Sequence, residues 1–318
     1  MNTLITGATG FIGRHLLEKI VNTRDREEVY CLARTKASCD ELEREGISTI
    51  RADLKDRSIL NERLKNLDIE IVYHLAALAR INKSKNEYLI NNIAGTENLM
   101  ECLKSHAKSL KKIIHMSSIH AYPGHNSAYA KSKKKGEEIV IEVCRGMGIP
   151  YCILRPPIVY GPGCKADAGL LKFSASASKK SIFSRLNFPG KCSLVHVYDL
   201  VRFCICLEKS KEADNQIFSI YSDKCVSIDD IMEKIYRELD IVRKKIKIPG
   251  VFYAAIGKML PLALSLLPSG ADLEDSMNLL LKDSWTCDML KARELLNFEP
   301  DYNIDGSIKE VLYCLTKT

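Results

Sequence analysis

The chain of 318 residues lacks several patterns that mark specialised classes of protein. None of its 12 cysteines forms a Cys-x-x-Cys pair, and its seven histidines show no spacing typical of metal ligands. It also shows no signal-peptide pattern, so we expect reduced thiols in the cytoplasm rather than a disulfide framework. The sequence therefore predicts no metal site.

Long apolar runs are also absent. The most apolar stretch, residues 251–268, contains Lys258, Pro261 and Pro268 and is short for a bilayer. The interrupted pattern favours a buried helix pair or a wall of the substrate site, and contact with a membrane surface is the alternative. We expect no integral membrane segment.

Charge of one sign does not dominate the chain, and it has no internal repeat. The formal net charge is +7, charged residues make up 27% of the chain, and hydrophobic residues make up 46%. This composition predicts one large globular domain or two smaller ones. The basic balance suits an anionic cofactor or small-molecule substrate. A mildly basic enzyme is favoured over a protein with a nucleic-acid partner.

What the first half does contain is a regular alternation of short apolar runs and amphipathic stretches. Strands are predicted over residues 2–6, 28–33, 47–53, 69–77, 111–118 and 150–156. Helices are predicted over about 11–21, 87–105 and 128–145. Near-continuous apolar strands separated by helices predict an α/β fold, a doubly wound parallel sheet of the Rossmann type.

After Pro156 the alternation loosens. A strand followed by a helix is predicted over 193–209, another strand over 215–222, and helices over 227–240, 251–267, 271–282 and 288–296. We therefore expect a Rossmann domain formed by 1–159 plus 193–225. A smaller, mostly helical substrate-binding lobe would comprise 160–192 plus 226–318.

Three glycines, Gly7, Gly10 and Gly13, follow the first predicted strand directly and open the first helix. Gly7 permits a tight turn, Gly10 lets the backbone approach a pyrophosphate, and Gly13 lets the helix pack close to the sheet. Glycines also mark ordinary turns, but this position between a strand and a helix favours dinucleotide binding.

The ends of the second and third strands bear on which dinucleotide binds. Arg34 follows the second strand, with Lys36 nearby, and a guanidinium suits a 2′-phosphate. A solvated arginine at a strand end is the alternative interpretation. NADP(H) is therefore favoured, and NAD(H) remains possible. Asp53 closes the third strand, where it is placed to accept a hydrogen bond from adenine or to cap a helix.

Tyr129 and Lys133 stand four residues apart on a predicted lysine-rich helix. The same spacing recurs at Tyr313 and Lys317, so it does not by itself identify a catalytic pair. On a helix, this spacing puts both side chains on one face. A tyrosine transfers a proton near neutral pH only if nearby positive charge lowers its pKa, which is normally about 10.

Taken together, the motifs resemble the extended short-chain dehydrogenase/reductase family, the NAD(P)-dependent epimerase and dehydratase type. They occur in the family's order: TGATGFIG (6–13), ADL (52–54), VYHLAA (72–77), NNIAGTENL (91–99), SS (117–118), YAKSK (129–133), LRPPIVYGPG (154–163) and LVHVYDL (194–200). Residues 288–310 resemble the family's usual C-terminal ending.

The resemblance implies a role for each matching residue. It implies that Ser118, Tyr129 and Lys133 form the catalytic trio, with Ser118 orienting the substrate oxygen. The implied cofactor contacts are Gly7, Gly10, Phe11, Ile12, Gly13, Arg34, Asp53, Leu54, Leu75, Ala76, Ala77, Tyr129, Lys133 and Pro156. The implied substrate contacts are Asn92 and Ser118, to which we add Arg185 and Lys191.

Several departures bear on the substrate. Ser118 and Tyr129 are only 11 residues apart, which predicts a trimmed lid over the pocket. Cys192 stands where nucleotide-sugar enzymes often carry an arginine, with Lys191 beside it, and Arg185 is a candidate replacement. His120 and His125 lie in the loop before Tyr129; we expect both to be exposed, and contact with the substrate is the alternative.

The sequence thus predicts an NAD(P)-dependent oxidoreductase or epimerase that acts at a hydroxyl or keto carbon, with a nucleotide sugar as the favoured substrate. The first alternative is an NADPH-dependent reductase of an apolar, steroid- or flavonoid-like ketone. The second is a cofactor-binding regulator without turnover. A homodimer through the helices over 87–105 and 128–145 is implied by the resemblance alone.

Overall fold

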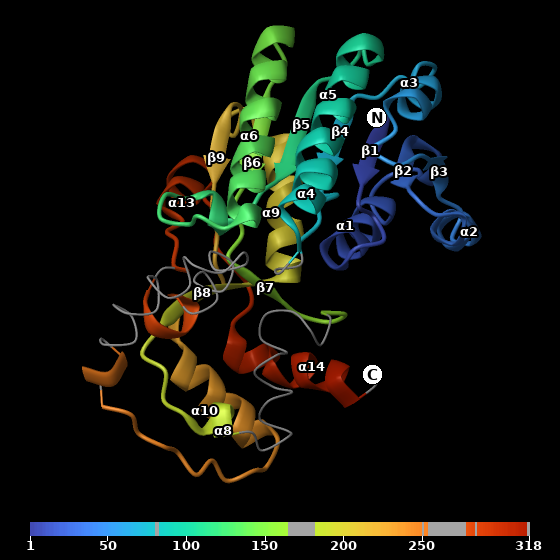
Figure 1. The fold of residues 1–318 in the computed structure, drawn as a ribbon. Coiled ribbons are helices and arrows are strands. Elements are labelled where there is room, and N and C mark those ends of the chain that lie inside the picture. Colours follow the sequence, from blue (N-terminus) through green and yellow to red (C-terminus); the bar gives the residue numbers. More distant parts are fainter. Residues whose placement is uncertain (80–82, 165–181, 250, 254–277, 284, 317–318) are drawn as a thin grey trace.

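A parallel sheet forms the centre of the larger part of the molecule (Figure 1). The computed structural model describes residues 1–79, 83–164, 182–249, 251–253, 278–283 and 285–316. Within these, seven parallel strands pair in the order β3-β2-β1-β4-β5-β6-β9. They are β1 (Thr3–Thr6), β2 (Val29–Ala33), β3 (Ser48–Arg51), β4 (Ile71–His74), β5 (Lys112–Met116), β6 (Tyr151–Leu154) and β9 (Gln216–Phe218).

Helices cover both faces of this sheet. On one face lie α1 (Phe11–Val21), α2 (Lys36–Arg44), α9 (Val197–Lys209) and α13 (Leu290–Leu296). On the other lie α3 (Arg57–Leu64), α5 (Gly95–His106) and α6 (Ala128–Met147). Short turns η1 (Arg26–Glu28) and η3 (Ile119–Ala121) precede β2 and α6. The predicted doubly wound fold is confirmed.

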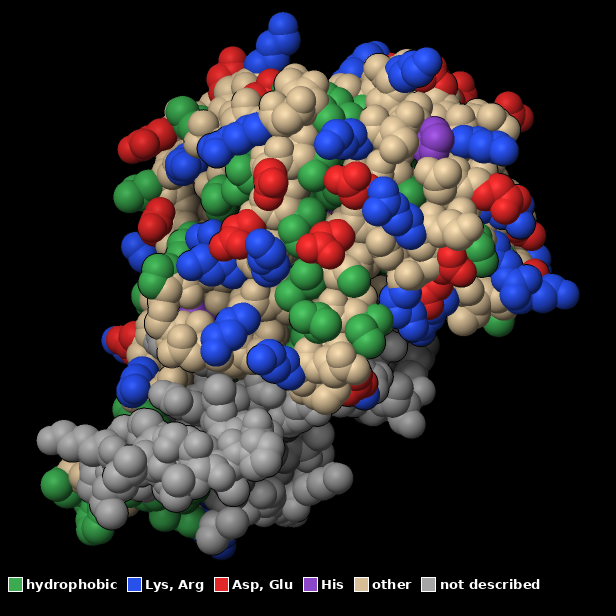
Figure 2. Space-filling view, turned by 45° about the horizontal axis from the view of Figure 1, so that its top comes forward, with side chains coloured by type: hydrophobic (Ala, Val, Ile, Leu, Met, Phe, Trp, Pro, Cys, Tyr) green, Lys and Arg blue, Asp and Glu red, His purple; other side chains and the backbone are tan. Residues whose placement is uncertain are grey.

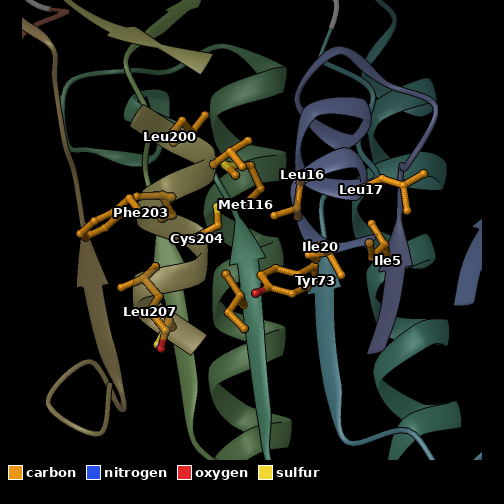
Figure 3. Packing of buried hydrophobic residues seen from close by; sticks show 14 of the residues in the cluster. Ile5, Leu16, Leu17, Ile20, Tyr73, Met116, Leu200, Phe203, Cys204 and Leu207 are labelled. Carbon is orange, nitrogen blue, oxygen red and sulfur yellow. The ribbon is translucent and has the colours of Figure 1, made fainter. Parts of the chain in front are cut away.

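The core between the sheet and α1 and α9 is built from aliphatic and aromatic side chains (Figure 3). Leu16 and Ile20 of α1 and Phe203 of α9 are fully buried, as is Tyr73 of β4. Leu16 and Ile20 stand four residues apart on α1, so both side chains lie on the one face of the helix that is buried against the sheet. The loops at the carboxyl ends of the strands are thereby held at one edge of the sheet.

A second, three-stranded sheet lies below the first (Figure 1). It contains β7 (Ile158–Tyr160), β8 (Lys191–His196) and β10 (Asp223–Ser227), in the order β10-β8-β7. Around it lie α8 (Ile182–Arg185), α10 (Ile228–Glu238) and α14 (Ile304–Thr316). Together with the sheet, α10 and α14 enclose a separate hydrophobic core.

The sequence did not predict this second sheet. Pro156 and Pro157 end the sixth strand, and the chain resumes as β7 against β8. β8 pairs with β7 and β10, whereas α9 and β9 return to the larger sheet. The predicted division into domains stays a prediction. The helices predicted over 251–267 and 271–282 fall largely outside the described residues.

The predicted helix over 87–105 is observed in three parts. α4 (Lys85–Tyr88) leads into a π-helical turn, η2 (Leu89–Ala94), and then into α5. A capping box at Ser84 begins the run, since its hydroxyl accepts from Glu87 N–H while the Glu87 carboxylate accepts from Ser84 N–H. No helix in the described part of the chain has the length and apolar character needed to cross a membrane.

Candidate active site

A groove of about 360 Å³ lies at the carboxyl ends of β1 to β4. Ligands of open parallel sheets bind at this edge. Of the predicted cofactor contacts, the groove is lined by Gly7, Gly10, Arg34, Asp53, Leu54, Leu75, Ala76 and Ala77. Thr35 and Ser38, which sequence reasoning did not select, also line it.

The glycine turn has the shape that close approach requires. Gly7 has a φ of +77°, and a Cβ there would stand 2.8 Å from the backbone nitrogen of Ala76. A Cβ on Gly13 would stand 2.1 Å from the carbonyl oxygen of Gly7. Gly10 caps α1 without a side-chain hydrogen bond, and the first helical turn holds no acidic residue. These features fit a dinucleotide pyrophosphate at the start of α1.

The polar end of the groove is formed by the segment after β2. Arg34 is exposed there, and the hydroxyl of Thr35 caps α2 by accepting from Ser38 N–H at 3.2 Å. On the opposite wall, Asp53 accepts from Lys55 N–H at 3.0 Å, and its second oxygen lies 3.4 Å from Lys55 Nζ. Part of the hydrogen-bonding capacity of Asp53 is therefore used within its own loop.

The structure brings Ser118 and Tyr129 together. Ser118 caps η3 after β5, and Tyr129 lies in the first turn of α6; both side chains are buried, and the Ser118 hydroxyl acts to lower the pKa of the Tyr129 phenol. The neighbouring Ser117 hydroxyl is instead bonded to Glu137. Lys133, one turn beyond Tyr129, is buried and donates from Nζ to the carbonyl oxygen of Met116 at 2.7 Å.

Burial governs the ionisation of this trio. It raises the pKa of Tyr129 to about 12, which the hydrogen bond from Ser118 partly opposes. Burial also lowers the pKa of Lys133 to about 8, which Glu137 opposes. Sequence reasoning expected a lowered Tyr129 pKa, and that expectation is wrong for the protein as described. The phenol carries its proton at neutral pH, which is the form that acts as an acid.

His120 is buried, so the expectation that it is exposed is wrong. Its Nδ1 lies 3.1 Å from Ser118 Oγ, and its ring centroid lies 5.3 Å from that of Tyr129. The ring of Trp285 packs edge-on against it at 4.3 Å. No signal in the sequence links Trp285 to this loop, because only the fold of the C-terminal part brings it here.

The remaining cofactor and substrate candidates on the sheet side hold the loops in place. Asn92, in η2, accepts from Leu78 N–H at 2.6 Å and donates to Ser132 Oγ at 2.9 Å, which ties the groove to α6. The carbonyl of Pro156 accepts from Ile119 N–H at 3.0 Å and so anchors η3. Phe11 packs against the second core and Ile12 against the first, although they are adjacent.

Arg185 and Lys191 make their contacts elsewhere. Arg185 donates to the carbonyl oxygen of Lys244 at 2.9 Å and lines a separate groove of about 440 Å³ with Tyr236. Lys191 Nζ lies 3.8 Å from Asp283. Their predicted role in substrate binding stays a prediction. Among the described residues, no group of three or more His, Cys, Asp or Glu side chains is arranged to hold a metal ion.

The comparison with protein families agrees with this geometry. Residues 3–220 match the model of the NAD dependent epimerase/dehydratase family. The chain belongs to that family. The resemblance drawn from the motifs is therefore confirmed, and the match spans the glycine turn, the trio and the strands β7, β8 and β9.

Two curated relatives illustrate the range of the family. The chain is 27% identical to a 3beta-hydroxysteroid-dehydrogenase/decarboxylase, isoform 2, of Arabidopsis thaliana, over 97% of its own length and 61% of that protein. It is 25% identical to a UDP-glucose 4-epimerase of Vibrio cholerae, over 96% of its own length and 93% of that enzyme.

Solved structures show the same fold. A UDP-glucose 4-epimerase of Thermotoga maritima, determined with UDP-glucose, superposes with a TM-score of 0.77 at 20% identity. The superposition covers 100% of this chain and 99% of the epimerase chain. A UDP-glucuronic acid 4-epimerase of Bacillus cereus, in complex with NAD, superposes with a TM-score of 0.76 at 22% identity, with coverage of 100% and 99%.

Proposed function

We propose that this chain is an NAD(P)-dependent oxidoreductase or epimerase that acts at a hydroxyl or keto carbon of a nucleotide sugar. The observation that carries the proposal is the buried pair of Ser118 and Tyr129 at the same sheet edge as the glycine-lined groove. A binder without turnover has little physical need for a tyrosine held in this way. Relatives named as UDP-sugar epimerases support the substrate class.

The residues of the trio divide the work. When bound, the nicotinamide cofactor supplies or accepts the hydride. Tyr129 gives its proton to the substrate oxygen in reduction and removes it in oxidation. Ser118 orients the substrate oxygen toward the Tyr129 phenol. We assign to Lys133, buried one helical turn beyond Tyr129, the role of placing positive charge near the phenolate.

The direct test is turnover by the purified protein with a panel of UDP-sugars, with product stereochemistry and cofactor reduction both measured. Tyr129→Phe should lower kcat by roughly 10²- to 10⁴-fold and leave cofactor affinity unchanged, because only the acid–base group is lost. Tyr198→Phe, at a partly exposed tyrosine, is the matched control. Unchanged hydride transfer in Tyr129→Phe would reject the assignment.

NADP(H) is the favoured cofactor within this proposal. Arg34, Thr35 and Ser38 present one cation and two hydroxyls at one end of the groove, a set that suits a 2′-phosphate. Arg34→Ala should weaken NADP binding by about 10- to 100-fold and leave NAD binding unchanged. Arg44→Ala, at an exposed arginine at the far end of the adjacent helix α2, is the control. Equal binding of NADP by wild type and Arg34→Ala would contradict this role.

An apolar ketone or alcohol is the second candidate substrate. The Arabidopsis relatives named as 3beta-hydroxysteroid-dehydrogenase/decarboxylases match 97% of the chain and favour it. Calorimetric titration with uridine diphosphate separates the two, since a nucleotide-sugar enzyme binds the diphosphate without its sugar. The absence of saturable binding at millimolar ligand would reject the nucleotide sugar.

A further inference from the structure

His120 occupies a position that the catalytic trio does not explain. It lies two residues after Ser118, in η3, and its side chain is 6% exposed. We propose that His120 relays protons between Tyr129 and solution through the hydroxyl of Ser118. The inference rests on the proposed function and adds a residue to it.

The hydroxyl of Ser118 joins two titratable rings. On one side it acts on the Tyr129 phenol, whose pKa it lowers and whose ring centroid lies 5.3 Å from that of His120. On the other side it lies 3.1 Å from His120 Nδ1 and also accepts from His120 N–H at 3.3 Å. His120 thus holds the Ser118 oxygen through both its backbone N–H and its imidazole. A substitution of His120 therefore changes the one hydroxyl that touches the phenol.

Two further rings pack against His120 besides that of Tyr129. Trp285, 7% exposed, packs edge-on against the imidazole with centroids 4.3 Å apart. His125, which is half-buried, lies on another side with centroids 4.9 Å apart. Among the described residues, the titratable rings that face His120 are thus Tyr129 and His125. Because Ser118, Tyr129 and His120 are all less than a tenth exposed, a proton reaches the phenol most directly through these side chains.

Each proton in the relay has a donor and an acceptor. In reduction, Tyr129 gives its proton to the substrate oxygen and becomes a phenolate. The phenolate takes the Ser118 hydroxyl proton, and Ser118 takes a proton from His120 Nδ1. His120 Nε2 takes one from solution, so the imidazole ends neutral with its tautomer exchanged. One proton is consumed, and oxidation runs the same transfers in reverse.

This relay serves net oxidation or reduction. In an epimerase, Tyr129 returns to the substrate the proton that it removed, so no exchange with solution is needed. In a reductase, each turnover consumes one proton that must be replaced. A connection from Tyr129 through Ser118 to His120 therefore favours net redox turnover over epimerisation.

The first experiment compares His120→Gln with wild type in steady state with cofactor and substrate. Glutamine keeps a hydrogen bond to Ser118 but does not pass a proton between two nitrogens. We expect kcat to fall at least about tenfold, KM to stay within about twofold, and the loss to grow as pH rises. His106→Gln, at a half-buried histidine bonded to Asn61 at the end of α5, should match wild type. A wild-type kcat and pH profile in His120→Gln would overturn the relay.

The second experiment needs no substrate. The phenol of Tyr129 is titrated by ultraviolet difference spectroscopy in the cofactor-loaded protein, with Tyr129→Phe as the blank. His120→Gln and Ser118→Ala should each move its midpoint by about one pH unit, and the double variant should move it no further. An unmoved midpoint in His120→Gln, or additive shifts, would overturn the relay. Failure to find any turnover would reject the proposed function and leave this titration decisive for the relay.

Discussion

At the scale of single residues, glycine positions decide whether the dinucleotide groove can form. Gly13→Ala would place a methyl group 2.1 Å from the Gly7 carbonyl oxygen, so the turn must move away from α1. We expect a loss of about 1–3 kcal/mol in the free energy of unfolding and at least a tenfold weaker affinity for the dinucleotide. Chemical denaturation and fluorescence titration with the cofactor measure the two effects.

Gly146→Ala is the matched control for that prediction. Gly146 lies inside α6, and a Cβ there would meet nothing within 4 Å. Alanine in that position should raise the free energy of unfolding by about 0.5–1 kcal/mol, because it restricts the unfolded chain. Equal effects of the two substitutions would show that the close contact at Gly13 has no consequence.

The pKa of Lys133 predicts a pH limit on activity. Burial lowers it from 10.5 to about 8 in the folded protein, so the ammonium is lost as pH rises through about 8. The kcat/KM of hydride transfer should therefore fall above that pH. Glu137 raises the Lys133 pKa, so Glu137→Gln should move the fall to lower pH. Lys135→Gln, on the exposed side of α6, should leave the pH of this fall unchanged. If Glu137→Gln also leaves that pH unchanged, Glu137 does not raise the pKa of Lys133.

At the scale of elements, α6 places its functional residues on one face at intervals of four. Tyr129, Lys133 and Glu137 are all buried there. Glu137 accepts from Arg155 Nε at 2.8 Å and from Arg155 Nη2 at 2.5 Å, which ties α6 to the end of β6. The same guanidinium lies 4.7 Å from the centroid of the Tyr122 ring. The ion pair thus joins the helix of the trio to the strand that precedes the second sheet.

Breaking this ion pair should destabilise the protein strongly. Glu137→Gln leaves a largely buried guanidinium without its carboxylate, and we expect the free energy of unfolding to fall by about 3–5 kcal/mol. Adding Arg155→Met should recover part of the loss, since no buried charge then remains. Urea denaturation of the single and double variants measures both values.

An exposed pair on the same helix serves as the control. Lys135 and Glu138 lie 3.4 Å apart at half-exposed positions, so Glu138→Gln should change the free energy of unfolding by less than about 0.5 kcal/mol. A loss in Glu138→Gln equal to that in Glu137→Gln would mean that burial of the Glu137 carboxylate contributes nothing.

At the scale of the whole molecule, Asp199 joins the C-terminal segment to the larger sheet. Its buried carboxylate accepts from the backbone N–H of Asp301 at 2.8 Å and of Tyr302 at 3.2 Å. It also accepts from Ser222 Oγ at 2.6 Å. Asp199 stands at the start of α9, whose other face packs on the sheet, and α14 follows directly after Tyr302.

Asp199→Asn should release this segment. The asparagine amide has one acceptor oxygen in place of two, so its NH2 group faces a backbone N–H donor that then lacks an acceptor. We therefore expect a loss of about 3 kcal/mol in the free energy of unfolding. Limited proteolysis should then cut near residue 300 before the larger sheet unfolds. Asp301→Asn removes only an exposed ion pair with Arg202 and should behave as wild type. Cleavage at the same rate in wild type and Asp199→Asn would contradict this role.

Surface charge bears on the proposed homodimer. The exposed charged positions of α6 are Lys131, Lys134, Lys135, Glu138, Glu142 and Arg145. Figure 2 shows Lys and Arg interspersed with Asp and Glu over the face that it presents. A dimer through α5 and α6 therefore requires charge pairing between copies, and its stability should fall as salt rises.

The sequence by itself determined the local parts of this protein. Alternating apolar and amphipathic runs predicted the larger sheet, and Gly7 to Gly13 predicted the first turn, because period and turn chemistry are local properties. His74 of the VYHLAA motif lies in β4 of that sheet. The structure shows His74 between Thr6 and Thr96, with burial lowering its pKa to about 3.

Only the tertiary structure decided the rest. The second sheet joins β7, β8 and β10, which lie far apart in the chain, and no local pattern encodes that pairing. Tyr129 has a raised pKa because burial is a property of the folded whole, whereas the sequence showed only its spacing from Lys133. Trp285 reaches His120 for the same reason: the fold alone sets which distant side chains share one buried volume.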